Sequence, residues 1–259
     1  MRAKRCAFTL IELLVVIAII ALLMSILMPS LNRARKQART VACLANLKQW
    51  GYIWHMYTED SGGKFNTGGT AGGDAANDWL VLLLPYYEDR GKLTLCPAAT
   101  LPMVSPGQFA FRAWSWDRQG WANLKQKETP DCGSYGQNEW ICDRPYPEYW
   151  KNRNTIKKPD TVPLFFDCGY VDAYPNANAG PPQFEGDISG FNEWTILCMN
   201  RHIGYVNYLF ADMSQRKAGL KELWTFKWNR QFNIFNAWTR AGGVTPDDWP
   251  DWLKPFKDY

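Results

Sequence analysis

The feature that most constrains this chain is an apolar run near its N-terminus. The run extends over 21 residues from Phe8 to Met28 and contains one charged side chain, Glu12. As an α-helix with a rise of ~1.5 Å per residue, it would be roughly 31 Å long, which is about the thickness of a hydrocarbon core. Its length predicts a membrane helix, but Glu12 needs a separate explanation. A carboxylate inside hydrocarbon costs a few kcal/mol, and such residues usually face a partner that relieves this cost.

Three simpler interpretations of the run explain it less well. A cleaved secretory signal has an apolar region of about 7–15 residues and a small-residue cleavage site, whereas this run is longer and Pro29-Ser30-Leu31 follows it. A plain membrane anchor explains the length but not Glu12. A buried core helix is rarely apolar on every face over such a length.

The residues around Glu12 resemble a known processing signal. Basic residues and then Ala7-Phe8-Thr9-Leu10-Ile11-Glu12-Leu13-Leu14 are similar to the class III signal of type IV prepilins and type II secretion pseudopilins. The resemblance implies that a prepilin peptidase cuts between Ala7 and Phe8 and methylates the new amine. It also implies that Glu12 pairs with the amino group of Phe8 on a neighbouring subunit, which places an opposite charge beside the buried acid. Ala7 stands where the family usually has glycine.

This resemblance implies a division of the chain into a leader at 1–7, an N-terminal helix at 8–58 and a globular head at 59–259. Residues 8–28 would be the transmembrane and polymerisation part of the helix, and 29–58 its amphipathic part. Pro29 falls where many pilins have a helix-breaking proline, and because proline lacks a backbone N–H we expect a disturbance of the helix there.

The second part of the predicted helix has one apolar stripe. Its members recur at spacings of four, three, four and three, which places them on one helix face; they are Cys43, Leu47, Trp50, Trp54 and Tyr57. The stripe predicts that this part of the helix packs on the head.

The head is large enough for a core of its own, and 46% of the whole chain is hydrophobic. Asp78 is suited to cap a short helix, and Thr245 followed by Pro246 is suited to begin another. Short segments bounded by Gly, Pro or Asp predict strands at 92–95, 134–141, 161–167, 205–211 and 214–217. We therefore expect an α+β fold in which a long N-terminal hydrophobic helix packs on a head with an antiparallel β-sheet.

Charge carries less information than the motif. Basic residues are slightly more numerous after the apolar run than before it, which by itself favours the opposite topology, so the cleavage motif decides the orientation. It predicts a single-pass inner-membrane protein with its head outside the cytoplasm. Removing Arg2, Lys4 and Arg5 with the leader leaves 26 basic and 25 acidic residues, and this balance of +1 predicts no nucleic-acid partner.

Six of the seven cysteines remain after the leader is removed. An even number suits an oxidising compartment and up to three disulfides, although six cysteines allow 15 connectivities. We favour Cys132–Cys142 as a local staple, Cys43–Cys96 as a clamp between helix and head, and Cys168–Cys198 by elimination. The alternative is that several of them are buried thiols.

A second resemblance covers the head. Residues 201–212 are similar to pilin-like proteins of planctomycete-type bacteria that carry a His, nine residues and then Asp-Gly; here His202 and Asp212 keep this spacing, but Met213 replaces the glycine. If that glycine serves a turn that needs positive φ, Met213 implies a different turn or strain. The resemblance assigns no role to the motif. Because an extended strand would separate the two residues by roughly 30 Å, we predict no catalytic residues and no enzyme activity.

Metal sites are not indicated strongly by the sequence. With no Cys-x-x-Cys and only two histidines, we predict no zinc site and no cofactor. An acidic loop at Glu185, Asp187 and Glu193 is a minor candidate for calcium, since some pseudopilins bind it in their heads.

Two classes of function follow from these observations. In the first, the chain is a pilin or pseudopilin, a structural subunit whose partners are other such subunits, the prepilin peptidase and inner-membrane assembly machinery. In the second, it is a membrane-anchored or filament-tip binding module that recognises glycan or secreted cargo. The second requires an exposed aromatic platform, for which the candidates are Trp114, Trp116 and Trp121, or Trp224, Trp228 and Trp238.

Overall fold

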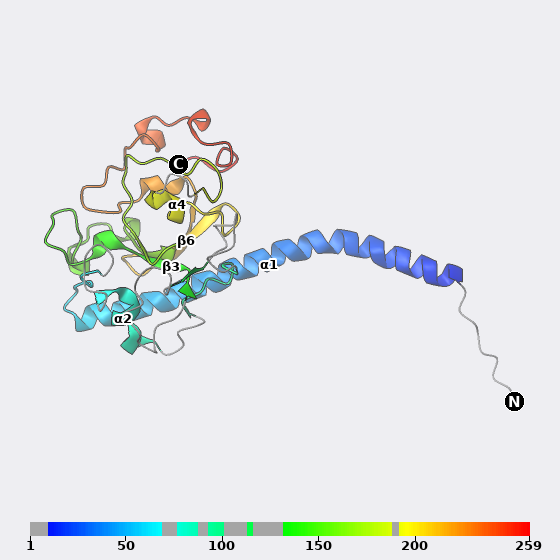
Figure 1. Ribbon diagram of the computed structural model, residues 1–259, viewed down its shortest axis with the longest axis horizontal. Helices are drawn as coiled ribbons and strands as arrows, with labels where there is room; N and C mark the ends of the chain where they lie inside the picture. Colours follow the sequence, from blue (N-terminus) through cyan, green and yellow to red (C-terminus); the bar gives the residue numbers. More distant parts are fainter. Residues whose placement is uncertain (1–9, 69–76, 88–92, 101–112, 116–131, 188–191) are drawn as a thin grey trace. The chain divides into compact units, whose positions relative to one another are not determined.

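The computed structural model describes residues 10–68, 77–87, 93–100, 113–115, 132–187 and 192–259. It contains two compact units, residues 1–38 and Arg39–Tyr259, which are described here one at a time. The long helix α1 (Leu10–Asp60) contributes to both units (Figure 1). Pro29 lies inside α1, and the helix continues through it rather than breaking. A proline removes one backbone donor, and in this helix that loss does not end the hydrogen-bonded ladder on either side.

The described part of the first unit is the start of α1, which contains the apolar run. Among the described residues, α1 is the one helix long and apolar enough to cross a membrane. Its apolar side chains are exposed on every side; for example, Leu10 is 78% exposed and Ile26 is 67% exposed. A helix that is apolar all round requires lipid or other helices to cover it.

The second unit is built on a five-stranded sheet with the order β5-β3-β4-β6-β7. Neighbouring strands are antiparallel except for β3 and β5, which are parallel. The strands are β3 (Tyr135–Asn138), β4 (Pro163–Asp167), β5 (Asp172–Ala173), β6 (Tyr205–Phe210) and β7 (Gln215–Gly219). A separate short pair joins β1 (Trp114–Ser115) to β2 (Cys132–Gly133). The predicted α+β class, with a long helix and a mostly antiparallel sheet, is confirmed.

The two faces of the sheet carry different halves of the core. Because side chains alternate along a strand, Phe165 and Leu209 face α1, whereas Phe166 and Tyr208 face the C-terminal segments. Figure 1 shows the second half of α1 on one side of β3 and β6, and α4 (Glu193–Leu197) on the other.

The predicted apolar stripe of α1 is confirmed. Cys43, Leu47, Trp50 and Trp54 are fully buried, and Tyr57 is half-buried against the same core. Trp50 is the central contact, since its ring lies 4.9 Å from Phe165 and 5.2 Å from Trp79, centroid to centroid. Its Nε1 donates a hydrogen bond to the carbonyl oxygen of Leu93.

That hydrogen bond belongs to a segment for which a strand was predicted. Lys92 lies outside the described residues, and Leu93–Leu95 is not in a strand. The carbonyl groups of Leu93 and Leu95 instead accept hydrogen bonds from Trp50 and Asn46 of α1. The two predicted helix starts are confirmed. Asp78 caps α2 (Trp79–Leu82), and Thr245 with Asp248 forms a capping box at the 3-10 helix Pro246–Asp248.

The described candidate tryptophans pack in the core and do not form the exposed platform that the second class of function requires. Trp114, Trp224 and Trp228 are buried, and Trp238 is half-buried against the same core. Trp116 and Trp121 lie outside the described residues. Trp194 and Trp224 stack with centroids 4.1 Å apart, and Trp228 packs edge-on against Trp194. These three rings pack on the face of the sheet opposite α1, where burial of their large apolar area stabilises the fold.

Candidate functional site

The N-terminal motif lies at the start of the described chain. Ala7 and Phe8, the predicted cleavage and methylation residues, precede the first described residue. Glu12 is an acidic residue in the first turn of α1, where the helix dipole favours a negative charge.

A second candidate site is a buried polar cluster inside the head. It consists of Cys43 on α1, Cys96 in the loop after Leu95, Asp167 at the end of β4, and His202 just before β6. The side chains of Asp167 and His202 have no exposed surface, and both cysteines are buried. One donor atom from each residue lies within 4.8 Å of the others.

Short contacts connect these four residues. Oδ2 of Asp167 lies 2.8 Å from Nε2 of His202 and accepts from Sγ of Cys43 at 3.2 Å. Sγ of Cys96 lies 3.4 Å from the same His202 nitrogen. Oδ1 of Asp167 accepts a hydrogen bond from the buried guanidinium of Arg201 at 3.1 Å.

The cluster shifts the pKa of each member in a direction that charge explains. Burial would raise the pKa of Asp167, but the charges of His202 and Arg201 and the hydrogen bond from His202 outweigh it and lower this pKa. Burial would lower the pKa of His202, yet Asp167 raises it to about 9. Burial raises the pKa of Cys43. Burial also opposes ionisation of Cys96, but hydrogen bonds from Cys43 and His202 and the charge of Arg201 bring its pKa to about 7.

Groups around the cluster orient its side chains. Thr40 Oγ1 lies 3.2 Å from Nδ1 of His202, so the other ring nitrogen points to the sulfur and carboxylate atoms. The hydroxyl of Tyr135 donates to Cys43 Sγ at 3.3 Å, and the backbone N–H of Ala98 donates to Cys96 Sγ at 3.4 Å. These contacts therefore fix the positions of the two sulfur atoms and of the His202 ring.

The predicted disulfides are not formed in this structure. Cys43, Cys96, Cys142, Cys168 and Cys198 are free, buried thiols, and the side chain of Cys132 lies outside the description. Their sulfurs take part in other contacts: Cys142 donates to Glu139, Cys168 to the carbonyl of Asp172 and Cys198 to that of Leu220. The sequence places Cys43 near Cys96 correctly, but as part of a four-residue cluster rather than as a covalent clamp.

The two residues of the His/Asp motif have separate surroundings. His202 is part of the buried cluster, whereas Asp212 is exposed in the β6–β7 turn, where its Oδ1 accepts from the backbone N–H of Ser214 at 2.9 Å. Met213 has φ +66°, so the turn has a positive φ at the position for which the sequence pattern suggested glycine. Ile203, next to His202, also has a positive φ of 57°.

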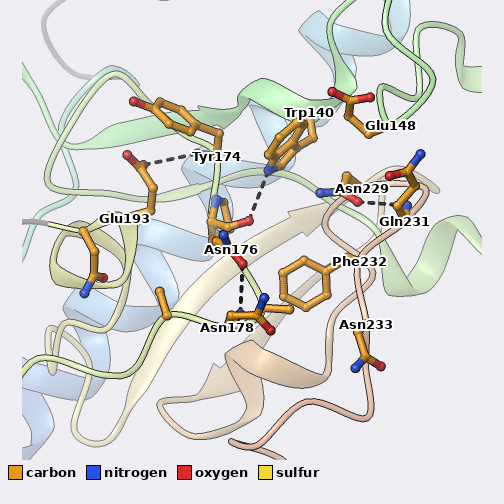
Figure 2. Close-up of a pocket in the computed structure, with 14 residues that line it drawn as sticks. Trp140, Glu148, Tyr174, Asn176, Asn178, Glu193, Asn229, Gln231, Phe232 and Asn233 are labelled. Carbon is orange, nitrogen blue, oxygen red and sulfur yellow. Dashed lines mark hydrogen bonds between the residues drawn. The ribbon is translucent and has the colours of Figure 1, made fainter.

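A cavity of about 780 Å³ forms a third candidate site, on the far side of the sheet from α1. Figure 2 shows Trp140, Tyr174 and Phe232 around it together with several carboxamide side chains. Two carboxylates, Glu148 and Glu193, also line it, and among the described residues of its lining there is no Lys or Arg. Burial raises the pKa of Glu193 to about 7, although the N–H of Tyr174 donates to this carboxylate.

The minor calcium candidate is not assembled. Asp187 is buried and accepts from the backbone N–H of Gln183, Glu193 accepts from Tyr174, and Glu185 is exposed. In the described part of the chain, the one group of three or more potential metal ligands is the cluster of Cys43, Cys96, Asp167 and His202. Asp187 and Glu193 accept hydrogen bonds from different backbone N–H groups, and the three acids do not form a shared site among the described residues.

Sequence reasoning missed this cluster because its members lie in four separate segments. No short spacing signals it, and Asp167 is indistinguishable in the sequence from other acids that follow strands. The available signals were the stripe position of Cys43 and the motif position of His202, which together point to the interface between α1 and the sheet.

Comparison with known proteins bears on the N-terminus alone. The model of the prokaryotic N-terminal methylation motif matches residues 2–28. No curated protein and no solved structure matches the chain. The matched residues include Ala7, Phe8 and Glu12 and continue into the apolar part of α1. The chain thus carries a prepilin N-terminal methylation motif joined to a long apolar helix, a combination consistent with a type IV pilin-like protein.

Proposed function

We propose that this chain is a structural subunit, a pilin or pseudopilin, of a type IV pilus-like or type II secretion filament. The observation that carries the proposal is the methylation motif at residues 2–28, which continues without interruption into a helix whose apolar residues are exposed on all sides. Such a helix is covered by lipid before assembly and by the helices of other subunits after it. The amphipathic part of the same helix is already covered by the head.

Processing follows from the motif. A prepilin peptidase cuts between Ala7 and Phe8 and methylates the amine of Phe8. The subunit then sits in the inner membrane as a single-pass protein with its head outside the cytoplasm, and inner-membrane machinery moves it into the filament. Alanine at position 7 is small enough to occupy the place of the usual glycine.

Glu12 sets the register of assembly in this proposal. The cut removes the basic leader and leaves a new amino group four residues before Glu12. In a stack of helices, the amine of one subunit reaches the carboxylate of its neighbour, and in hydrocarbon this pair is stronger than in water. A subunit in any other register would leave a carboxylate in the apolar core of the filament, at a cost of a few kcal/mol.

The test is Glu12→Gln, which keeps the shape of the side chain and removes its charge. We expect this variant to enter the membrane, fold its head and be cut before Phe8, but to be missing from the sheared filament fraction. Glu59→Gln is the matched control, because it removes another carboxylate from α1 at an exposed position beside Arg153 and should assemble normally. Mass spectrometry of the N-terminus separates failed processing from failed assembly. Normal filaments from Glu12→Gln would exclude the register role.

A second candidate function is the binding of a neutral, hydroxyl-rich ligand such as a glycan in the cavity of Figure 2. The observation that favours it is the lining, whose described residues combine aromatic rings with many carboxamides and include no Lys or Arg to attract an anion. Hydroxyl groups can both donate to and accept from carboxamides, and sugar rings pack on aromatic side chains.

A glycan array probed with the full-length protein in detergent tests this second function. Tyr174→Ala should abolish any binding seen with the wild type, because Tyr174 is an exposed ring of the cavity. Tyr146→Ala removes another exposed tyrosine outside the cavity lining and should bind as the wild type does. No binding by the wild type, or equal loss in both variants, would refute this function.

A further inference from the structure

We propose that Cys43, Cys96, Asp167 and His202 form a closed structural site for one Zn²⁺ ion. Their donor atoms already lie within 4.8 Å of one another. In a tetrahedral zinc site with ordinary bond lengths, neighbouring ligand atoms are roughly 3.3–3.8 Å apart. The N···O distance of 2.8 Å and the S···O distance of 3.2 Å would each have to widen by about half an ångström or less, and the S···N distance of 3.4 Å is already close to the value required.

The donor types fit zinc better than a harder cation. Two sulfurs, one imidazole nitrogen and one carboxylate oxygen are ligands that Zn²⁺ accepts with tetrahedral geometry, whereas Ca²⁺ and Mg²⁺ need shells of oxygen. On binding, the ion replaces the protons that the two thiols and Nε2 of His202 hold, and these protons leave to solvent.

Charge balance supports the same assignment. Two thiolates, one carboxylate and Zn²⁺ have a net charge of −1 with a neutral imidazole. Arg201 is fully buried and binds Asp167 through Oδ1, which leaves Oδ2 for the ion. Its guanidinium brings the sum to zero, so the occupied site would bury no net charge.

The surrounding hydrogen bonds are those expected around metal ligands. Thr40 can accept from Nδ1–H of His202, which fixes the tautomer in which Nε2 is available to the ion. Tyr135 and the backbone of Ala98 donate to the two sulfurs and so stabilise the thiolate forms. A cluster that served only to pair Asp167 with Arg201 would not need two sulfurs with their own donors.

The site would join four segments of the head. Cys43 lies on α1, Asp167 ends β4, and Cys96 and His202 come from connecting segments, so one ion would fix the second half of α1 to the sheet. All four ligands are protein side chains, and the site is buried, so no coordination position is left for a substrate. The role is therefore structural, and it is independent of whether the chain forms filaments.

The first experiment measures metal content of the full-length protein in detergent after exposure to ZnCl₂ and removal of loosely bound metal. We expect one zinc per chain in the wild type and almost none in Cys96→Ser. Cys198→Ser is the matched control, since it alters an equally buried thiol outside the cluster and should retain one zinc. Retention of zinc by Cys96→Ser, or no zinc in the folded wild type, would overturn the proposal.

A second measurement guards against variants that fail to fold. CoCl₂ added to the wild-type protein should produce the visible bands of tetrahedral Co²⁺ and the charge-transfer absorption of cobalt–thiolate bonds, and ZnCl₂ should remove them. Thr40→Val, which keeps the volume of the side chain but loses the oxygen beside His202, should bind the metal about 10–100-fold more weakly. An octahedral spectrum, or an unchanged affinity in Thr40→Val, would contradict the proposed ligand arrangement.

Discussion

Trp50 is the side chain by which α1 is most firmly packed on the head, so Trp50→Ala tests this packing directly. The indole ring is fully buried and lies within about 5 Å, centroid to centroid, of the rings of Phe165, Trp79 and Tyr87. Its Nε1 is also the donor to the carbonyl group of Leu93. The substitution therefore removes three ring contacts and one hydrogen bond at once.

The magnitude follows from the buried area. A tryptophan buries ~200 Å² of surface, and at ~25 cal/mol per Å² this is worth roughly 5 kcal/mol, of which alanine retains a part. Partial collapse of the cavity reduces the loss of stability, whereas the unsatisfied carbonyl of Leu93 increases it. We expect the free energy of unfolding of the head to fall by about 3–5 kcal/mol. Trp50→Phe should cost less, about 1–3 kcal/mol, because it keeps an aromatic ring and loses the donor.

Urea unfolding of the full-length protein in detergent measures this loss, with near-ultraviolet circular dichroism as the signal. Tyr52→Ala is the control, because Tyr52 lies on α1 two residues away with 58% of its surface exposed and should change stability by no more than about 0.5 kcal/mol. A cost below about 1 kcal/mol for Trp50→Ala would refute the conclusion that the stripe of α1 is part of the core of the head.

Two further predictions concern one buried acid and one strained residue. Burial raises the pKa of Asp78 to about 7 from an unfolded value of 3.8, so the folded state holds more protons than the unfolded state between these values and its stability falls as pH rises through that window. Asp78→Asn keeps the cap on Leu80 and should flatten part of this slope in unfolding curves measured from pH 4 to 8. The remaining slope is due to Asp172, Glu139 and Glu193, whose pKa values burial also raises, and an unchanged slope would contradict the assignment. Ile203→Asn should raise the melting temperature, with a gain of about 1 kcal/mol, because Ile203 holds a positive φ that asparagine tolerates better. Ile234→Asn, at a partly exposed isoleucine without positive φ, should give no gain, and equal effects at both positions would exclude strain as the cause.

The parts of the fold that local sequence determines were predictable. The apolar run, the stripe of α1 and the caps at Asp78 and Thr245 depend on spacing within a few residues, and the structure bears these out. The strands at β3, β4, β6 and β7 were also recognisable from their boundaries. For Met213 the sequence left two outcomes open, a different turn or strain, and the positive φ of this residue corresponds to the second.

The contacts between distant segments were not predictable. Of the two possibilities for the cysteines, disulfides or buried thiols, the structure has buried thiols at the five described side chains. Cys43 and Cys96 contact Asp167 and His202, and nothing in the sequence connects these four residues. Leu93–Leu95 has the composition of a strand. In the structure, however, the carbonyl groups of Leu93 and Leu95 accept hydrogen bonds from the side chains of Trp50 and Asn46 instead of from a neighbouring strand. The many tryptophans are more often core residues than a surface platform, but sequence counts cannot show that they form layers on both sides of one sheet.

The burial of the second half of α1 has a consequence for the order in which the chain folds. Thr40 contacts His202 and Asn207, which follow it by more than 160 positions, and Leu47 belongs to the same core as Leu209. The ribosome therefore releases the helix long before the strands that cover it, and folding must await loops of this length to close. During that interval the rings of Trp50 and Trp54 stay uncovered on the same helix as the apolar run. Nascent chains in this state expose apolar surface that favours aggregation until β6 and β7 emerge.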